Sequence, residues 1–403
     1  MGDLPCFTSV LAGRLMGGDG KFCGDGVINL CGGILSRPVG GYFFGNMSDI
    51  RGYLHAMKLG MLLAVLLISF MAAVPSDLGQ GWLAFYLMLL CRLLLGFAHG
   101  GVSAAVNVAS FDLTVRRGGG VSSSLVYSMA AVGKCVSLLV ILLSDLLLED
   151  DRMYVWGWRI PLVLGAVAGL VILIFLCRMD DIAGRSALLV EGKVSGGLSF
   201  VKFSLIFFMS SGTVVCYNLW VSTAVVAGVE YFGISERKMF ILSFLQTLIF
   251  SILVFVAGLR WDGENHLRRY RNFLIVLCVF SPVMLLLNFP GLHPSNIFYL
   301  VAIFLSIVPL SLVCSAIPVA VVRVMAGSSK GIGNGVPYSV AVAGLGGTAP
   351  MIRHALEDHY AVFSVYVLSC VFVLLPSRSD CSGPMLRPRY NQPRDYPASP
   401  AHR

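Results

Sequence analysis

Apolar residues fall into long, nearly unbroken runs along this chain, separated by short polar segments. Within each run the apolar positions would surround a helix rather than form one stripe, which is typical of segments embedded in lipid. A helix that crosses a bilayer needs about 20 such residues. The pattern predicts eleven membrane spans, at residues 27–46, 57–75, 82–106, 121–147, 160–177, 202–228, 239–259, 272–289, 296–320, 332–352 and 360–376.

The 27–46 run is the weakest of these, because glycines and Arg37 dilute it. Residues 1–26 are glycine-rich and charged, and we predict no helix there. Residues 377–403 are polar and contain several prolines, which predicts a disordered tail.

Basic residues gather in alternate polar segments, and this bias sets the orientation of the spans. One side holds Arg51, Lys58, Arg116, Arg117, Arg178, Arg185, Lys193, Arg260, Arg268, Arg269, Arg271, Arg323, Lys330 and the arginines of the tail. We predict that this side is cytoplasmic, which leaves residues 1–26 outside and the tail inside.

Composition agrees with a multi-pass all-α membrane protein. Charged residues make up 12% of the chain, about half of what soluble domains carry. The net charge of +8 resides in the loops between spans, so it does not indicate a nucleic-acid partner. The eleven cysteines contain no Cys-x-x-Cys pair, and we predict no metal site and no cofactor.

Four motifs stand out within this pattern. The stretch SRPVGGYFFGNMSDIRGY, residues 36–53, places closely spaced glycines before a charged turn. RLLLGFAHGG, residues 92–101, combines an arginine in mid-span with glycines one helical turn apart. WGWRIP, residues 156–161, opens a span, and GIGNGVPY, residues 331–338, opens another. Glycines at such spacing let two helices approach closely in lipid.

Together these motifs resemble the major facilitator superfamily of transporters. Arg-Pro-x-Gly-Gly, Gly-Phe-x-x-Gly-Gly and Gly-Trp-Arg-Ile-Pro resemble most closely its metabolite:proton symporter family, which includes proline/betaine and dicarboxylate carriers. The resemblance implies twelve helices in two bundles, of which this chain supplies eleven, starting at the second. The expected parts are a non-membrane segment 1–26, a bundle 27–177 (family helices 2–6), a cytoplasmic linker 178–201, a bundle 202–376 (family helices 7–12) and the tail 377–403. We therefore expect a truncated or decaying transporter that lacks the first helix.

The resemblance also implies a cytoplasmic gate. Its residues are Gly45, Asp49, Arg51, Gly52, Asp112 and Arg117, and Asp49 would face the glycine-rich helix start at Gly331. The alternative is a set of solvated loop charges of little energetic value. Two residues depart from the family pattern. Ile50 follows Asp49 where the family usually has an arginine, and Val102 stands where the family commonly has a glutamate, which concerns proton coupling.

Ionisable residues within spans are functional candidates, because they are costly in lipid. The substrate or coupling candidates are Arg37, Arg92, His99, Lys134, Tyr217 and Trp220. The alternatives are a helix-pairing role for Arg92, pairing with an acid such as Asp145 for Lys134, and plain packing for His99, Tyr217 and Trp220. A structural role is expected for Gly96, Gly100, Gly157, Trp158, Arg159 and Pro161.

These features predict a monomeric secondary active transporter in a bacterial inner membrane. It would carry a small zwitterionic or carboxylate metabolite with protons, by alternating access. The alternative is a truncated membrane relic that no longer transports and has a structural or sensing role. A membrane enzyme ranks last, because the sequence shows no nucleophile–base pair.

Overall fold

The computed structural model describes residues 33–74, 81–117, 120–148, 157–179, 199–220, 228–229, 233–260, 266–286, 296–325, 329–356 and 359–372. These residues are almost entirely helical. The helices are α3 (Arg37–Arg51), α4 (Tyr53–Ala73), α5 (Gly81–Arg117), α6 (Val121–Leu147), α8 (Arg159–Arg178), α10 (Phe200–Asn218), α12 (Glu236–Leu259), α13 (His266–Leu286), α14 (Asn296–Val324), α15 (Lys330–Ala341), the π-helical turn η4 (Val342–Gly346), α16 (Ala349–Ala355) and α17 (Tyr360–Phe372).

The predicted all-α membrane fold is confirmed. A helix lies in every one of the eleven predicted spans, and seven of the described helices are long and apolar enough to cross a membrane. The segment 1–26, nearly all of the linker 178–201 and the tail 377–403 lie outside the described residues.

Four predicted spans, 27–46, 272–289, 332–352 and 360–376, have no counterpart among the seven apolar spans described. The run 27–46 corresponds to α3, which has 15 residues and is too short to be counted there. The run 332–352 is not one continuous helix: α15 gives way to η4, and a turn at Gly347 precedes α16. Pro350, which has no amide hydrogen, lies in the first turn of α16, where a proline is tolerated.

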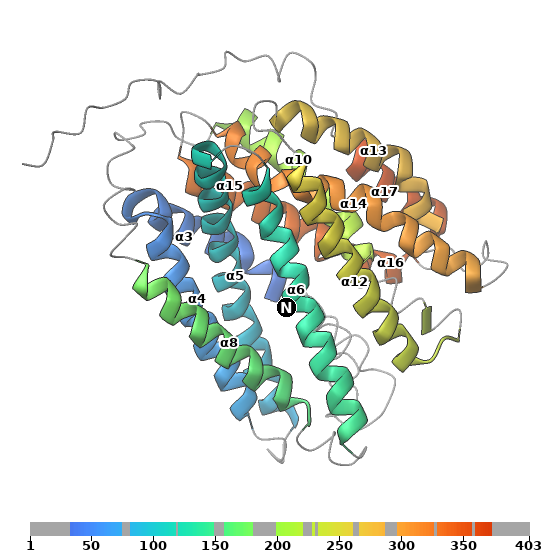
Figure 1. The fold of residues 1–403 in the computed structure, drawn as a ribbon, viewed down its shortest axis with the longest axis horizontal. Coiled ribbons are helices and arrows are strands. Elements are labelled where there is room, and N and C mark those ends of the chain that lie inside the picture. The colour runs from blue at the N-terminus through green and yellow to red at the C-terminus, as the bar shows by residue number, and fades with distance from the viewer. Residues whose placement is uncertain are drawn as a thin grey trace, which may run out of the picture.

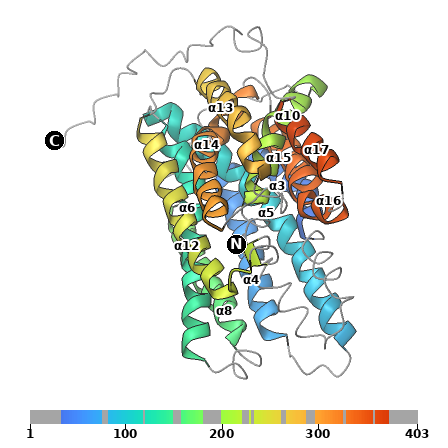
Figure 2. The same cartoon turned by 90° about the vertical axis from the view of Figure 1, so that its right-hand side faces the viewer.

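The N-terminal helices (α3–α8) meet the C-terminal helices (α10–α17) along two long seams (Figures 1 and 2). In the first seam α3 packs along α15, and in the second α6 packs along α12. On its other side α3 packs against α5, while α4 lies between α5 and α8. Helices α13, α14 and α17 complete the C-terminal part.

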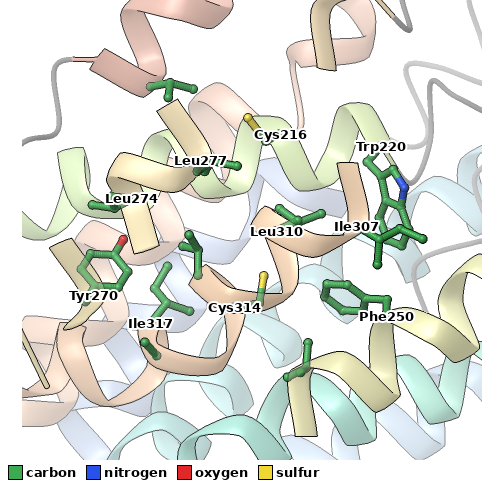
Figure 3. Close-up of a cluster of buried hydrophobic side chains, with 14 of the residues drawn as sticks. Cys216, Trp220, Phe250, Tyr270, Leu274, Leu277, Ile307, Leu310, Cys314 and Ile317 are labelled. Atoms are coloured by element: carbon green, nitrogen blue, oxygen red, sulfur yellow. The ribbon is translucent and has the colours of Figure 1, made fainter. Parts of the chain in front are cut away.

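Helix α14 is the centre of the largest buried cluster (Figure 3). It is the most buried of the seven apolar spans, whereas α8 is the least buried. Two prolines interrupt its backbone hydrogen bonding, at Pro309 and Pro318. Ser306, Ser311 and Ser315 each donate to a carbonyl three residues earlier in the helix, so their hydroxyls are satisfied locally.

The first seam is a contact between helix backbones. Gly41 faces the Gly335 carbonyl, and Gly45 faces the Gly331 carbonyl, so that a methyl group at either glycine would overlap main-chain atoms of α15. The same holds in the opposite direction, because Gly331 and Gly335 face α3 carbonyls. The predicted role of these glycines in close helix approach is therefore visible here.

The contact between α3 and α5 follows the same rule. Gly40, next to Gly41 but on another face of α3, lies against the backbone of Phe97. Gly96 and Gly100, one turn apart on α5, lie against the carbonyls of Gly33 and Arg37. Helix α3 is thus held through its backbone by a neighbour on either side.

Candidate functional site

Asp49 binds the start of α15, as the resemblance implied. Its Oδ1 accepts a hydrogen bond from the Gly331 amide at 2.7 Å, and its Oδ2 accepts one from the Ile332 amide at 3.0 Å. These amides belong to the first turn of a helix, which has no internal acceptor for them and carries a partial positive charge. Ser329, the N-cap residue of α15, makes no side-chain capping hydrogen bond. Asp49 supplies the cap from another part of the chain.

The other members of the expected gate lie near this end of the molecule, at the ends of α3 and α5. Gly52 ends α3 with a positive φ of 90°, which only glycine adopts without strain. Arg51 is exposed and Asp112 is half-buried. The side chain of Arg117 is outside the described residues, so the four-charge network remains a prediction.

A pair of buried amides crosses between the halves behind this cap. Asn107 on α5 donates to Asn334 Oδ1 on α15 at 3.5 Å, and Asn334 donates to the Ala104 carbonyl at 3.2 Å. Their side chains are 5% and 0% exposed. The sequence analysis missed both residues, although Asn334 stands within the glycine-rich motif.

Arg37 lies where α3, α6 and α15 meet. The hydroxyls of Tyr127 on α6 and Tyr338 on α15 are hydrogen-bonded to each other at 2.7 Å, and the Arg37 guanidinium interacts electrostatically with both. Its Nε finds no hydrogen-bond partner in the described part of the chain. His99 on α5 is within electrostatic range of the same guanidinium.

An aromatic group continues from this tyrosine pair into the C-terminal helices. The Tyr127 and Tyr217 ring centroids are 6.3 Å apart in an edge-to-face arrangement. Tyr217 lies 6.2 Å from Trp220, and Trp220 lies 5.3 Å from Phe250. The Lys134 ammonium of α6 lies 6.0 Å from the centre of the Trp220 ring.

The structure thus joins most of the predicted candidates. Arg37, Lys134, Tyr217 and Trp220 belong to one group, which also contains Tyr127, Tyr338 and Phe250; we call these seven residues the central cluster. Their sequence positions gave no common motif, but the mid-span tyrosines at 127 and 338 are a signal that could have been noted. Arg92 lies elsewhere, where α5 contacts Gly33 before the start of α3.

Lys134 is the charged member of the central cluster that is most completely withdrawn from the surface. It is 3% exposed. A buried cation interacts strongly with an anion that enters a site of low dielectric constant. The central cluster therefore offers positive charge and aromatic faces to a small ligand.

The second seam has its own polar contact. Ser128 on α6 and Ser251 on α12 donate to each other's carbonyls at 3.1 and 3.0 Å, and their Oγ atoms are 3.0 Å apart. Both are buried. Closer to the basic loops, Gly258 of α12 lies against Ser124 of α6.

The run at residues 156–161 has local structural contacts. Arg159 donates from Nε to the Ala72 carbonyl at 3.2 Å and from a terminal nitrogen to the Val74 carbonyl at 2.9 Å. Its guanidinium lies 4.3 Å from the centre of the Trp158 ring, which is 3% exposed. Arg159 thereby caps the C-terminal end of α4, in agreement with the structural role expected for this motif.

Comparison with known proteins places the chain among transporters. Residues 31–181 match the family model described as "Sugar (and other) transporter". The alpha-ketoglutarate permease of Escherichia coli is 27% identical over 360 residues, which cover 81% of this chain and 76% of the permease. The proline/betaine transporter of Salmonella typhimurium is 26% identical over 137 residues, which cover 34% of this chain and 27% of that protein.

The fold agrees with these relatives. The proton:xylose symporter XylE of the major facilitator superfamily, solved with bound 6-bromo-6-deoxy-D-glucose, superimposes with a TM-score of 0.69 at 12% sequence identity, over 93% of this chain and 89% of the symporter. That likeness concerns the fold alone. The family match, the relatives and the solved structure are all membrane transporters rather than enzymes, and this chain is similar to them in sequence and in fold.

Proposed function

We propose that this protein is a secondary active transporter that carries a small carboxylate or zwitterionic metabolite together with protons, by alternating access. The observation that carries the proposal is the central cluster, because it contains Arg37 and Lys134 from the N-terminal helices and Tyr338 and Trp220 from the C-terminal helices. A substrate bound between two sets of helices can be exposed to either side of the membrane when the sets rock against each other.

Cations in this position favour a substrate with a carboxylate. The relatives support that class, because their names describe carriers of alpha-ketoglutarate and of proline and betaine. The proposal also includes a bacterial inner membrane and a monomeric state. The basic loops and the tail 377–403 lie on the cytoplasmic side, because of the charge bias between the spans.

The Asp49 cap supplies the cytoplasmic gate of this proposal. It joins the end of α3 to the start of α15, and opening this end of the molecule requires both hydrogen bonds to break. Such a contact is a two-state element, closed while Asp49 binds the amides and open when it is released.

Uptake into proteoliposomes tests the function directly. Purified protein is given labelled 2-oxoglutarate, proline or betaine, with and without an inward pH gradient. We expect saturable uptake of one of these compounds that the gradient accelerates. The absence of uptake for all three would favour the non-transporting alternative, and uptake that ignores the gradient would remove the proton from the proposal.

Neutral variants test the assignment of the cations. Replacing Lys134 or Arg37 with glutamine should raise the half-saturation concentration about tenfold or more, since a hydrogen bond to a charged group contributes about 1.5–3 kcal/mol. Lys238→Gln, at an exposed position on α12, is the matched control and should behave as the unaltered protein. A fall in folded protein with unchanged affinity in the remainder would instead give these cations a structural role.

Arg92 separates the two explanations further. Because its position on α5 lies away from the central cluster, beside Gly33, Arg92→Gln should leave the half-saturation concentration unchanged.

A further inference from the structure

The antiparallel register of α6 and α12 places Gln246 at the level of Lys134. Ser128 is hydrogen-bonded to Ser251. Two turns further along, Cys135 donates to the Phe244 carbonyl at 3.9 Å, so both contacts define the same register. Lys134 therefore lies within one residue of the level of Gln246, a rise of about 1.5 Å on a helix. Both side chains are buried, at 3% and 1% exposure.

Trp220, two residues past the end of α10, joins the two. Its ring lies 6.0 Å from the Lys134 ammonium and 5.3 Å from the ring of Phe250, and the close-up shows Trp220 and Phe250 side by side (Figure 3). Phe250 stands four residues after Gln246, and residues at that spacing share one face of a helix. Lys134, Trp220 and Gln246 thus approach one another at the second seam.

Two polar atoms in this group have no hydrogen-bond partner among the described residues. They are the Gln246 Oε1, an acceptor, and the Trp220 Nε1–H, a donor. Trp220 is 1% exposed, as is Gln246. Leaving such an atom buried without a partner is costly, and natural structures satisfy most of these atoms. A ligand that supplies one acceptor and one donor side by side would satisfy both atoms.

We propose that Lys134, Trp220 and Gln246 form a substrate subsite that recognises an α-hydroxy or α-amino carboxylate. The substrate carboxylate accepts from the Lys134 ammonium and from the Trp220 Nε1–H. The hydroxyl or ammonium group on the adjacent carbon donates to Gln246 Oε1. This inference rests on the proposed function and makes Gln246 its specificity-determining residue.

The subsite discriminates by the presence of a hydrogen atom on the group beside the carboxylate. An α-keto acid has only an acceptor there, which faces the Gln246 oxygen without a bond. A site built to bind a polar group rejects an analogue that lacks the partner more strongly than an apolar pocket rejects a change in size.

The test compares matched pairs of compounds as inhibitors of uptake into proteoliposomes. One pair is 2-hydroxyglutarate and 2-oxoglutarate, and the other is proline and N,N-dimethylproline. In each pair the first member can donate to Gln246 and the second cannot. We expect the first member to bind about fivefold or more tightly in the unaltered protein, because an unsatisfied buried acceptor costs at least about that factor.

Gln246→Met keeps the length of the side chain and removes the acceptor, so the ratio within a pair should fall to about twofold or less. Trp220→Phe keeps the ring and removes the donor to the carboxylate that all four compounds share. It should therefore weaken every compound several-fold and leave the ratios unchanged. Ser306→Ala on α14 is buried but satisfied within its own helix, and it should change neither quantity.

The outcomes are distinguishable. If none of the four compounds inhibits or enters, both the proposed function and this inference are wrong. If transport occurs but the folded Gln246→Met protein keeps the discrimination of the unaltered chain, or if the unaltered chain does not discriminate, the subsite is overturned while the proposed function stands. Thermal unfolding of each variant in detergent shows that the comparison concerns folded protein.

Discussion

The two seams between the N-terminal and the C-terminal helices differ in the groups that make the contact. In the first seam, α3 and α15 meet through glycine backbones, and Asp49 binds the α15 amides at its end. In the second seam, α6 and α12 meet through side chains, with the Ser128–Ser251 bonds in the middle and Lys134 and Gln246 further along.

This difference separates two tasks. A contact of glycine backbones has no room for a ligand, and a charge at its end makes it suited to closing and opening. A contact made of serine, glutamine and lysine side chains has polar atoms to present to a ligand. We therefore expect substitutions in the first seam to act on folding and on the rate of opening, and substitutions at Lys134 and Gln246 of the second seam to act on affinity.

The largest effect should come from adding a side chain to the first seam. A β-carbon at Gly41 would lie 2.5 Å from the Gly335 carbonyl oxygen, so Gly41→Val forces the two backbones apart and should destabilise the fold by about 3 kcal/mol. Gly133→Val is the matched control, since nothing lies within 4 Å of a β-carbon there. Thermal unfolding in detergent measures both, and equal losses would remove the special status of the first seam.

The next effect concerns the charge at the end of that seam. Asp49→Asn removes an anion that faces a helix N-terminus, an interaction of about 1–2 kcal/mol, and should slow uptake about tenfold while the protein still inserts. Initial uptake rates, normalised to the protein present in the liposomes, provide the measurement.

Arg51→Gln, compared with Asp49→Asn, tests whether the cap acts alone or within a charge network. Because Arg51 is exposed, a cap made by Asp49 alone predicts a small change, whereas the four-charge network with Asp112 and Arg117 predicts slowing comparable to that of Asp49→Asn. A normal uptake rate in the Asp49→Asn protein would show that the cap does not serve as a gate.

The smallest effect should arise in the middle of the second seam. Ser128→Ala and Ser251→Ala each remove one buried donor, and each should lower the free energy of unfolding by about 1 kcal/mol. A double-mutant cycle should show that the two losses are coupled, because the two Oγ atoms lie 3.0 Å apart and share a hydrogen bond. Strictly additive losses would mean that each serine acts only through the other's carbonyl, which both substitutions keep.

The sequence predicted the membrane fold well, because lipid imposes a long apolar run on every span. Helix α6 begins and ends within a residue of the predicted range, and α8 and α12 differ from theirs by only a few residues. The break after α15 was missed, since the apolar run continues through Gly344 and Gly346 while the helix does not.

The candidate site was predicted in part. Buried charges are costly in lipid, and this alone singled out Arg37 and Lys134. Tyr127, Tyr338 and Gln246 were missed because each is unremarkable within its own span. They become candidates only because the register of α3 on α15 and of α6 on α12 brings them close to those cations. The side-chain periodicity of one helix does not encode the register between two helices.

The backbone packing of α3 has a consequence for the speed of conformational change. Interlocked side chains must change rotamers when two helices separate, and must find them again when the helices close. Gly40, Gly41 and Gly45 have no rotamers, so α3 can slide or tilt against α5 and α15 without that side-chain entropy change. The glycines of the first seam can therefore separate and close without changing rotamers. The side chains of the second seam must change rotamers in each transport cycle.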